Sequence, residues 1–104
     1  KIKKRYTEGY YHDIYVYFPG GINTITSCMF KNAFVNQNDN KKINSKVHII
    51  IGEGVKTIEE SAFSSSGIYS VKLPQSLEVI ERYAFWDTSI TQNIKIPKNV
   101  KKKS

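Results

Sequence analysis

The sequence predicts a mainly β fold, a short solenoid of stacked coils with a parallel sheet along one face and few short helical turns. The first observation behind this prediction is a repeat of 22 to 23 residues that is interrupted by one insertion. The second is that no segment sustains an apolar period of 3.6 residues, so long helices are not expected. The third is the length, since 104 residues suit a single domain.

The repeat is visible as three stretches of fifteen residues that align without gaps and a fourth that is cut short. They begin at Val16, Ile49, Val71 and Ile94. The turn column of the repeat holds Pro19, Gly52, Pro74 and Pro97, at successive spacings of 33, 22 and 23 residues. Apolar residues fill the positions three and one before this column and three, six and eleven after it. One such unit cannot bury its apolar face alone, so the coils must stack.

Each unit predicts the same elements in the same order. β-Branched and aromatic residues predict strands at 14–18, 47–51, 71–73 and 94–96. Proline then ends the strand because it has no N–H for the ladder. A second extended piece points its apolar residues inward, at Ile22, Val55, Leu77 and Val100, and then at Ile25, Ile58 and Ile80. Segments 59–63 and 81–85 predict tight helical turns that place Phe63 and Phe85 in the core.

The chain is expected to divide as one solenoid domain over residues 1–104. Its parts are an N-terminal cap (1–13), repeat 1 (14–46) with an insertion (31–46), repeat 2 (47–67), repeat 3 (68–90) and a partial repeat with a basic tail (91–104). We expect the tyrosine-rich N-terminal segment to cover the open edge of the first coil; the alternative is that it binds a partner. The insertion is a solvated loop or a recognition loop, and its position does not decide between them. Because residue 1 is lysine and no leader precedes it, we expect a trimmed or processed chain.

The residues in these columns resemble the BspA-like leucine-rich repeat family. The resemblance is carried by Leu73-Pro74, Leu77, Ile80 and Ala84-Phe85, and again by Ile51, Val55, Ile58 and Ala62-Phe63. It is clear over residues 47–100 and weaker back to residue 14, where Met29-Phe30 replaces Ala-Phe. The resemblance implies a curved right-handed leucine-rich-repeat solenoid, used at the cell surface or after secretion for adhesion and protein binding. It brings no catalytic residues.

Two outward columns of the predicted sheet form the candidate binding site. Two residues before the turn column stand Tyr17, Ile50, Lys72 and Lys95, and four before it stand Tyr15, His48, Ser70 and Asn93. We therefore predict partner-binding residues at Tyr15, Tyr17, His48, Ile50, Lys72 and Lys95, anchored by tyrosines as binding hot spots often are. The alternative is that the same side chains pack across strands and only stabilise the sheet.

The sequence offers little material for catalysis, cofactors or metals. With one cysteine and two histidines it has neither a disulfide framework nor a metal-ligand spacing. Cys28 is expected to be a buried or half-buried structural thiol, because neither histidine is placed near it. No apolar run is long enough to span a membrane. We expect no enzyme activity, no cofactor and no metal.

The formal net charge of +7 lies at the two ends of the chain. Of the 16 lysines and arginines, 8 lie in residues 1–5 and 98–103, and residues 6–97 carry 8 basic and 9 acidic side chains. We interpret the ends as keeping exposed solenoid edges soluble and unpaired. The function we infer is a protein–protein interaction module that binds a host or cellular protein. The alternatives are a basic-tailed module that binds nucleic acid or an anionic surface, and a segment that spaces other domains.

Overall fold

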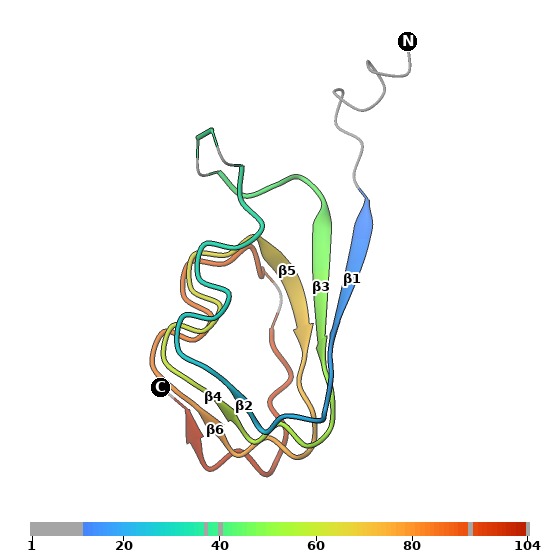
Figure 1. Ribbon diagram of the computed structural model, residues 1–104, viewed down its shortest axis with the longest axis vertical. Coiled ribbons are helices and arrows are strands. Elements are labelled where there is room, and N and C mark those ends of the chain that lie inside the picture. Colours follow the sequence, from blue (N-terminus) through green and yellow to red (C-terminus); the bar gives the residue numbers. More distant parts are fainter. Residues whose placement is uncertain (1–11, 37, 40, 92, 104) are drawn as a thin grey trace.

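The computed structural model describes residues 12–36, 38–39, 41–91 and 93–103, and this part of the chain holds seven strands and no helix (Figure 1). The strands are β1 (Asp13–Phe18), β2 (Thr24–Ile25), β3 (Lys46–Ile51), β4 (Thr57–Ile58), β5 (Ile68–Lys72), β6 (Val79–Ile80) and β7 (Lys102–Lys103). The mainly β fold predicted from the repeat is thus confirmed.

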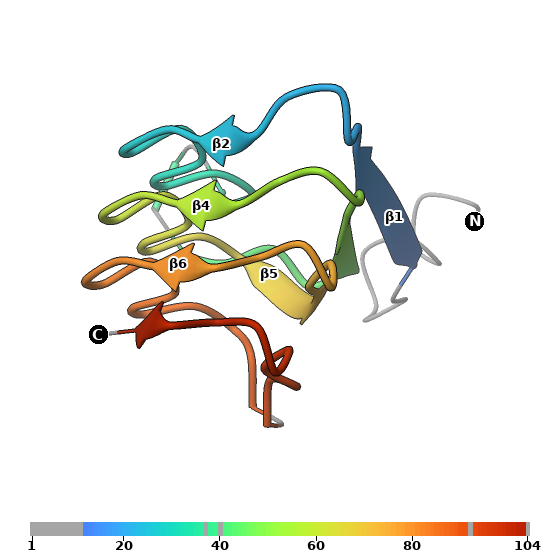
Figure 2. The ribbon, with the colours of Figure 1, turned by 90° about the horizontal axis from the view of Figure 1, so that it is seen from below.

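The strands form two parallel sheets that the chain visits in alternation. One sheet has the order β1-β3-β5 and the other the order β2-β4-β6-β7. Figure 2 shows the result, in which successive coils lie one upon another. We call β1 with β2 coil 1, β3 with β4 coil 2, and β5 with β6 coil 3. In each coil a turn segment follows the second strand, at 26–33, 59–66 and 81–87 respectively.

The core fills the space between the two sheets and the turn segments. Strand β3 alternates as its sequence predicts, with Val47, Ile49 and Ile51 buried. The buried apolar residues of the other elements are Ile25, Val55, Ile58, Ala62, Phe63, Ile68, Leu73, Leu77, Ile80 and Ala84. Coil 2 is buried most completely because coils cover it on both sides. Its Phe63 ring lies between those of Phe30 and Phe85, with centroids 5.1 and 5.3 Å away.

One apolar column of coil 1 is less buried than predicted. Ile22 is 42% exposed, whereas Val55 and Leu77, its counterparts in the next coils, are fully buried. The reason is position, because within the described residues no coil lies on the outer side of coil 1. The predicted cap falls mostly on residues 1–11, which lie outside the described residues.

The turn segments are not the helical turns that were expected. Each is a chain of β-turns in which two residues four apart take left-handed backbone angles. The first residues of these pairs are Cys28, Ser61 and Tyr83, with φ of 61, 59 and 60°. The second residues are Asn32, Ser65 and Asp87, with φ of 62, 56 and 56°. A left-handed residue interrupts a right-handed helix, so the segment bends repeatedly instead of winding.

The fourth coil also differs from its prediction. Residues 94–96 form no strand, although the sequence pattern predicts one. Instead, two lysines of the predicted basic tail form β7, where Lys102 pairs with Val79 and Lys103 with Ile80. Strand β7 is the edge of its sheet among the described strands.

Candidate functional site

The outward face of the β1-β3-β5 sheet carries five of the six predicted site residues in two rungs. The first rung places Tyr15 beside His48 and His48 beside Ser70. The second places Tyr17 beside Ile50 and Ile50 beside Lys72. The structure therefore brings these five residues together, as the column alignment of the repeat predicted. We call this surface the sheet face.

The two tyrosines are the most open part of the sheet face. Tyr17 is 70% exposed and Tyr15 is 57% exposed, although both belong to a strand. Strand β1 is the edge of its sheet among the described strands, so one flank of each ring meets no neighbouring strand. An exposed aromatic pair on a rigid sheet is a suitable anchor for a protein partner, because tyrosine offers much apolar area and few rotatable bonds.

His48 fixes the geometry of the first rung. Its ring stacks on Tyr15 with centroids 4.7 Å apart. Its Nε2 lies 2.8 Å from Asp13 Oδ1 and its Nδ1 lies 2.7 Å from Ser70 Oγ. Because a carboxylate only accepts, Nε2–H donates to Asp13, and in the neutral ring Nδ1 accepts the Ser70 hydroxyl proton. His48 thus joins three strands, and it is both the cross-strand support and the neighbour of the exposed tyrosine.

Tyr69 belongs to the same cluster, and the column alignment missed it. Its ring meets His48 edge-on at 5.6 Å, and the ammonium of Lys46 lies 5.1 Å from its ring centroid. The predicted strand at 71–73 does not include Tyr69. The register shifts between Val47 and His48, so that Val47 pairs with Ile68 and His48 with Ser70. The buried position accepts the aliphatic Ile68. The one feature of the sequence that could have indicated this shift is the aliphatic Ile68 directly before Tyr69.

Lys95 lies apart from the strand ladder. It is exposed and follows no strand of the sheet, so the prediction that it continues the column through a fourth strand is wrong. It nevertheless lines a surface hollow of about 500 Å³ together with Lys72, Gln75 and Lys98. From β1 to the segment beyond β5, the exposed side chains along this side of the molecule therefore change from tyrosines to lysines.

The insertion after coil 1 folds back onto the later coils. Val35 and Lys42 form an antiparallel bridge, and the ammonium of Lys42 reaches Asp87 Oδ1 at 3.1 Å. Hydrogen bonds from Lys42 and Ser65 lower the pKa of Asp87 from its ordinary value. The insertion is thus tied to coil 3 by an exposed ion pair, on the turn side of the stack and away from the sheet face.

The structure places the single cysteine differently from the sequence prediction. Cys28 is exposed, not buried, and it is the first left-handed residue of its turn segment. Among the described residues, no group of three His, Cys, Asp or Glu side chains could hold a metal ion. In that same part of the chain, no helix is long and apolar enough to cross a membrane.

Comparison with known proteins identifies the repeat. A sequence model of the BspA type leucine rich repeat region, in 6 copies, matches residues 40–104, which is more than half of the chain. The match includes both strands of coils 2 and 3 and strand β7. No curated protein and no solved structure matches the chain.

Proposed function

The chain belongs to the BspA-type leucine-rich repeat family, a typically non-enzymatic protein-interaction repeat, and we propose that it binds its partner through the sheet face. The anchor of this contact is the pair Tyr15 and Tyr17, flanked by Ile50 and Lys72. The observation that carries the proposal is the exposure of the two tyrosines on an ordered strand. Aromatic side chains that are held in place lose little entropy on binding.

The His48 cluster supports this function because it orders the surface before a partner arrives. Tyr15 is stacked on a histidine whose two ring nitrogens both have hydrogen-bond partners. The second rung ends in Lys72, and Lys95 extends the basic end of the face. A partner complementary to this surface has apolar pockets for the tyrosines and acidic side chains for the lysines.

We propose further that the partner is a host or cellular protein and that the contact serves adhesion. This step rests on the family resemblance, and it places the working location at the cell surface or outside the cell. The sheet face of three strands is small, so the expected contact lies near the low end of the size range of specific interfaces.

The test is affinity capture from host and cellular extracts, followed by a binding titration with the recovered partner. Tyr17→Glu and Lys72→Glu are each expected to weaken binding tenfold or more, as is typical for hot spots. Lys56→Glu is the matched control, since Lys56 is also an exposed lysine but lies off the sheet face. Equal binding by all three variants would refute the proposal.

The same titration separates protein binding from attraction to a polyanion. For binding to nucleic acid or heparin, the logarithm of the association constant falls steeply and linearly with the logarithm of the salt concentration. We expect a shallow salt dependence for the recovered partner and a large loss with Tyr17→Glu. A steep salt dependence together with no effect of Tyr17→Glu would instead assign the interaction to the lysine-rich ends.

A further inference from the structure

The turn after the first strand of coil 3 is held by a carboxylate from coil 2. The backbone N–H of Gln75 donates to Glu53 Oε2 at 2.9 Å, and the N–H of Ser76 donates to Glu53 Oε1 at 3.1 Å. Each oxygen of one carboxylate therefore accepts one N–H, and the negative charge strengthens both hydrogen bonds. The structure thus shows a ligand that fits this pair of N–H groups, and it is a carboxylate.

The same turn recurs one coil later, in residues 94–103, which we call coil 4. In coil 3 the N–H of Leu77 donates to Pro74 O at 3.2 Å, and in coil 4 the N–H of Val100 donates to Pro97 O, also at 3.2 Å. The residue that follows each turn by one position donates to the preceding coil, at 2.8 Å in coil 3 and at 2.7 Å in coil 4. The two turns therefore have the same backbone arrangement and the same position against the coil before them.

The turn of coil 4 has the pair of N–H groups but not the carboxylate. By the equivalence of the two turns, the N–H groups of Lys98 and Asn99 face coil 3. The residue of coil 3 that corresponds to Glu53 is Gln75, whose side chain carries no charge. Within the described part of the chain, no hydrogen bond has the N–H of Lys98 or Asn99 as its donor. This pair lies between two described coils and not on an outer side of the stack.

Basic side chains surround this pair of N–H groups. Lys72, Lys95 and Lys98, together with Gln75, line the hollow of about 500 Å³ to which both coils contribute, and no acidic side chain lines it. The ion pairs found among the described residues involve none of these three lysines. Two successive backbone N–H groups beside cationic side chains attract an anion.

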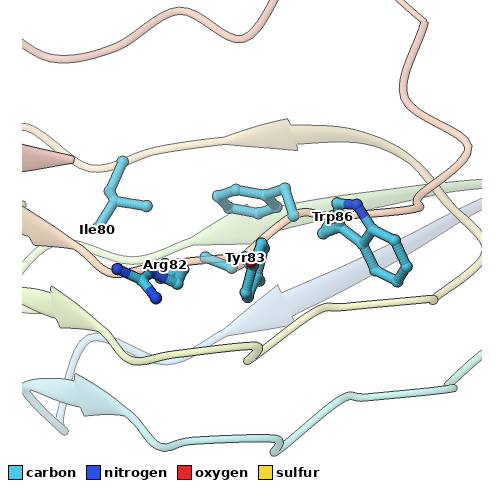
Figure 3. A pocket seen from close by; sticks show the side chains of 6 residues that line it. Ile80, Arg82, Tyr83 and Trp86 are labelled. Carbon is cyan, nitrogen blue, oxygen red and sulfur yellow. The ribbon is translucent and has the colours of Figure 1, made fainter. Parts of the chain in front are cut away.

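The hollow beside the turn segment of coil 3 differs in charge. Figure 3 shows this hollow, which is lined by Ile80, Arg82, Tyr83, Ala84, Phe85 and Trp86. Arg82 is the one charged side chain in its lining, and its guanidinium carbon lies 5.8 Å from the centroid of the Tyr83 ring. Of these two hollows, the one that is lined by three lysines therefore suits an anionic ligand.

We propose that the turn of coil 4 is a carboxylate-binding site, which takes an aspartate or glutamate side chain of a partner protein. One carboxylate oxygen accepts the N–H of Lys98 and the other accepts that of Asn99, while the lysines of the hollow balance the charge. The carboxylate takes the place that Glu53 has one coil earlier. That the carboxylate comes from a protein rests on the proposed function, because Lys72 and Lys95 belong to both sites.

A blocked tripeptide tests the site without the partner. The probe is glutamate between two glycines, acetylated and amidated so that its side chain is its only charge, and it is titrated at constant ionic strength while backbone amides are followed by NMR. We expect the Lys98 and Asn99 amide protons to shift downfield and to saturate with a Kd on the order of 10 mM. The Ser76 amide is the control, because it already donates to Glu53. Absence of saturation, or equal shifts with a glutamine tripeptide, overturns the proposal.

Methyl sulfate checks the class of anion, because it carries the same single negative charge as the tripeptide. Its oxygens are weaker hydrogen-bond acceptors than those of a carboxylate, so we expect it to bind more weakly than the tripeptide in the same titration. Equal or tighter binding of methyl sulfate would overturn the assignment to a carboxylate.

Gln75→Glu places the carboxylate of coil 2 at the same position of coil 3 and should fill the site from within. Because the new carboxylate competes within the same chain, the affinity for the tripeptide should fall by about tenfold or more. The Lys98 and Asn99 amide protons should already be shifted downfield before the tripeptide is added. Thr26→Glu is the matched control, since it adds the same charge at an exposed position of coil 1, and it should change the affinity by less than about twofold. Equal affinities of the two variants would refute the site.

The partner recovered by affinity capture separates this inference from the proposed function. Gln75→Glu should weaken binding of the partner by about threefold to tenfold, and Thr26→Glu should not. If Tyr17→Glu weakens binding and Gln75→Glu does not, the carboxylate site is refuted as a partner contact and the sheet face stands. If the tripeptide binds and Gln75→Glu weakens binding of the partner but Tyr17→Glu does not, the sheet-face anchor is refuted and the carboxylate site stands.

Discussion

The ring of His48 stacks on the ring of Tyr15, with centroids 4.7 Å apart and planes inclined by 19°. These residues lie in neighbouring strands, and the same histidine is held by Asp13 on one side and Ser70 on the other. The exposed tyrosine therefore rests on a support that three strands fix.

Replacing His48 tests this support. His48→Ala removes a stacked ring and two hydrogen bonds, so we expect a loss of about 1–3 kcal/mol in the free energy of unfolding. Urea unfolding followed by circular dichroism measures it. Lys95→Ala, at a predicted site residue outside the strand ladder, should change stability by less than about 0.5 kcal/mol. Equal losses in both variants would mean that the contacts of His48 do not stabilise the fold.

The stacked phenylalanines predict that the same substitution lowers the free energy of unfolding more in coil 2 than in coil 3. Phe63→Ala removes a fully buried ring and should cost about 3–5 kcal/mol, whereas Phe85→Ala should cost clearly less because Phe85 is only half-buried. If Phe63→Ala prevents folding, Phe63→Leu and Phe85→Leu give the same comparison. Chemical denaturation ranks the variants, and a larger loss at Phe85 would contradict the burial order.

Two adjacent glycines provide a matched pair at the first turn column. A Cβ on Gly20 would collide with the backbone carbonyl of Glu53 in the next coil, whereas a Cβ on Gly21 would have no atom within 4 Å. Gly20→Ala should therefore cost about 1–3 kcal/mol, as overpacking does. Gly21→Ala should be neutral or slightly stabilising. The thermal midpoints of the two variants decide, and similar midpoints would argue against close packing of coils 1 and 2 at this turn.

The ion pair of the insertion predicts a pH dependence. Hydrogen bonds from Lys42 and Ser65 lower the pKa of Asp87 in the folded state. A carboxyl with a lowered folded pKa stabilises the fold above its unfolded pKa of about 4, and this stabilisation is lost as pH falls through the folded value. Asp87→Asn should thus be less stable than the parent chain at pH 7, with the difference shrinking below pH 4. A difference that persists at pH 2 would exclude the carboxylate as its source.

The sequence predicted the parts of the fold that repeat. Apolar columns at fixed offsets placed Ile49, Ile51 and Phe63 in the core, because each coil must bury the same face. The rungs of the sheet face followed from the same alignment. The end coils were predicted less well: Ile22 and residues 94–96 obey the pattern, but Ile22 is 42% exposed and residues 94–96 form no strand. The sequence pattern indicates which face of a coil is apolar, but it does not indicate which part of the protein covers that face.

The turns and the bulge could not be predicted for a different reason. Ser61 and Ser65 take left-handed angles without glycine, and their N–H groups donate to carbonyls of coil 3. Tyr83 and Asp87 take the same angles in the turn segment that accepts these hydrogen bonds. The register shift beside Tyr69 arises because Ile68 fills the buried position and leaves one extra residue in β5. Both features depend on contacts between coils, which a single stretch of sequence does not contain.

Site-directed photocrosslinking tests the central claim, that the sheet face binds the protein partner, most directly. A photoreactive phenylalanine analogue is placed at Tyr17 in one variant and at Met29 in another, since both side chains are exposed but lie on different sides of the coil stack. Each variant is irradiated with the partner recovered by affinity capture. We predict a crosslinked product from position 17 and none from position 29. A product from position 29 with none from position 17 would contradict the account.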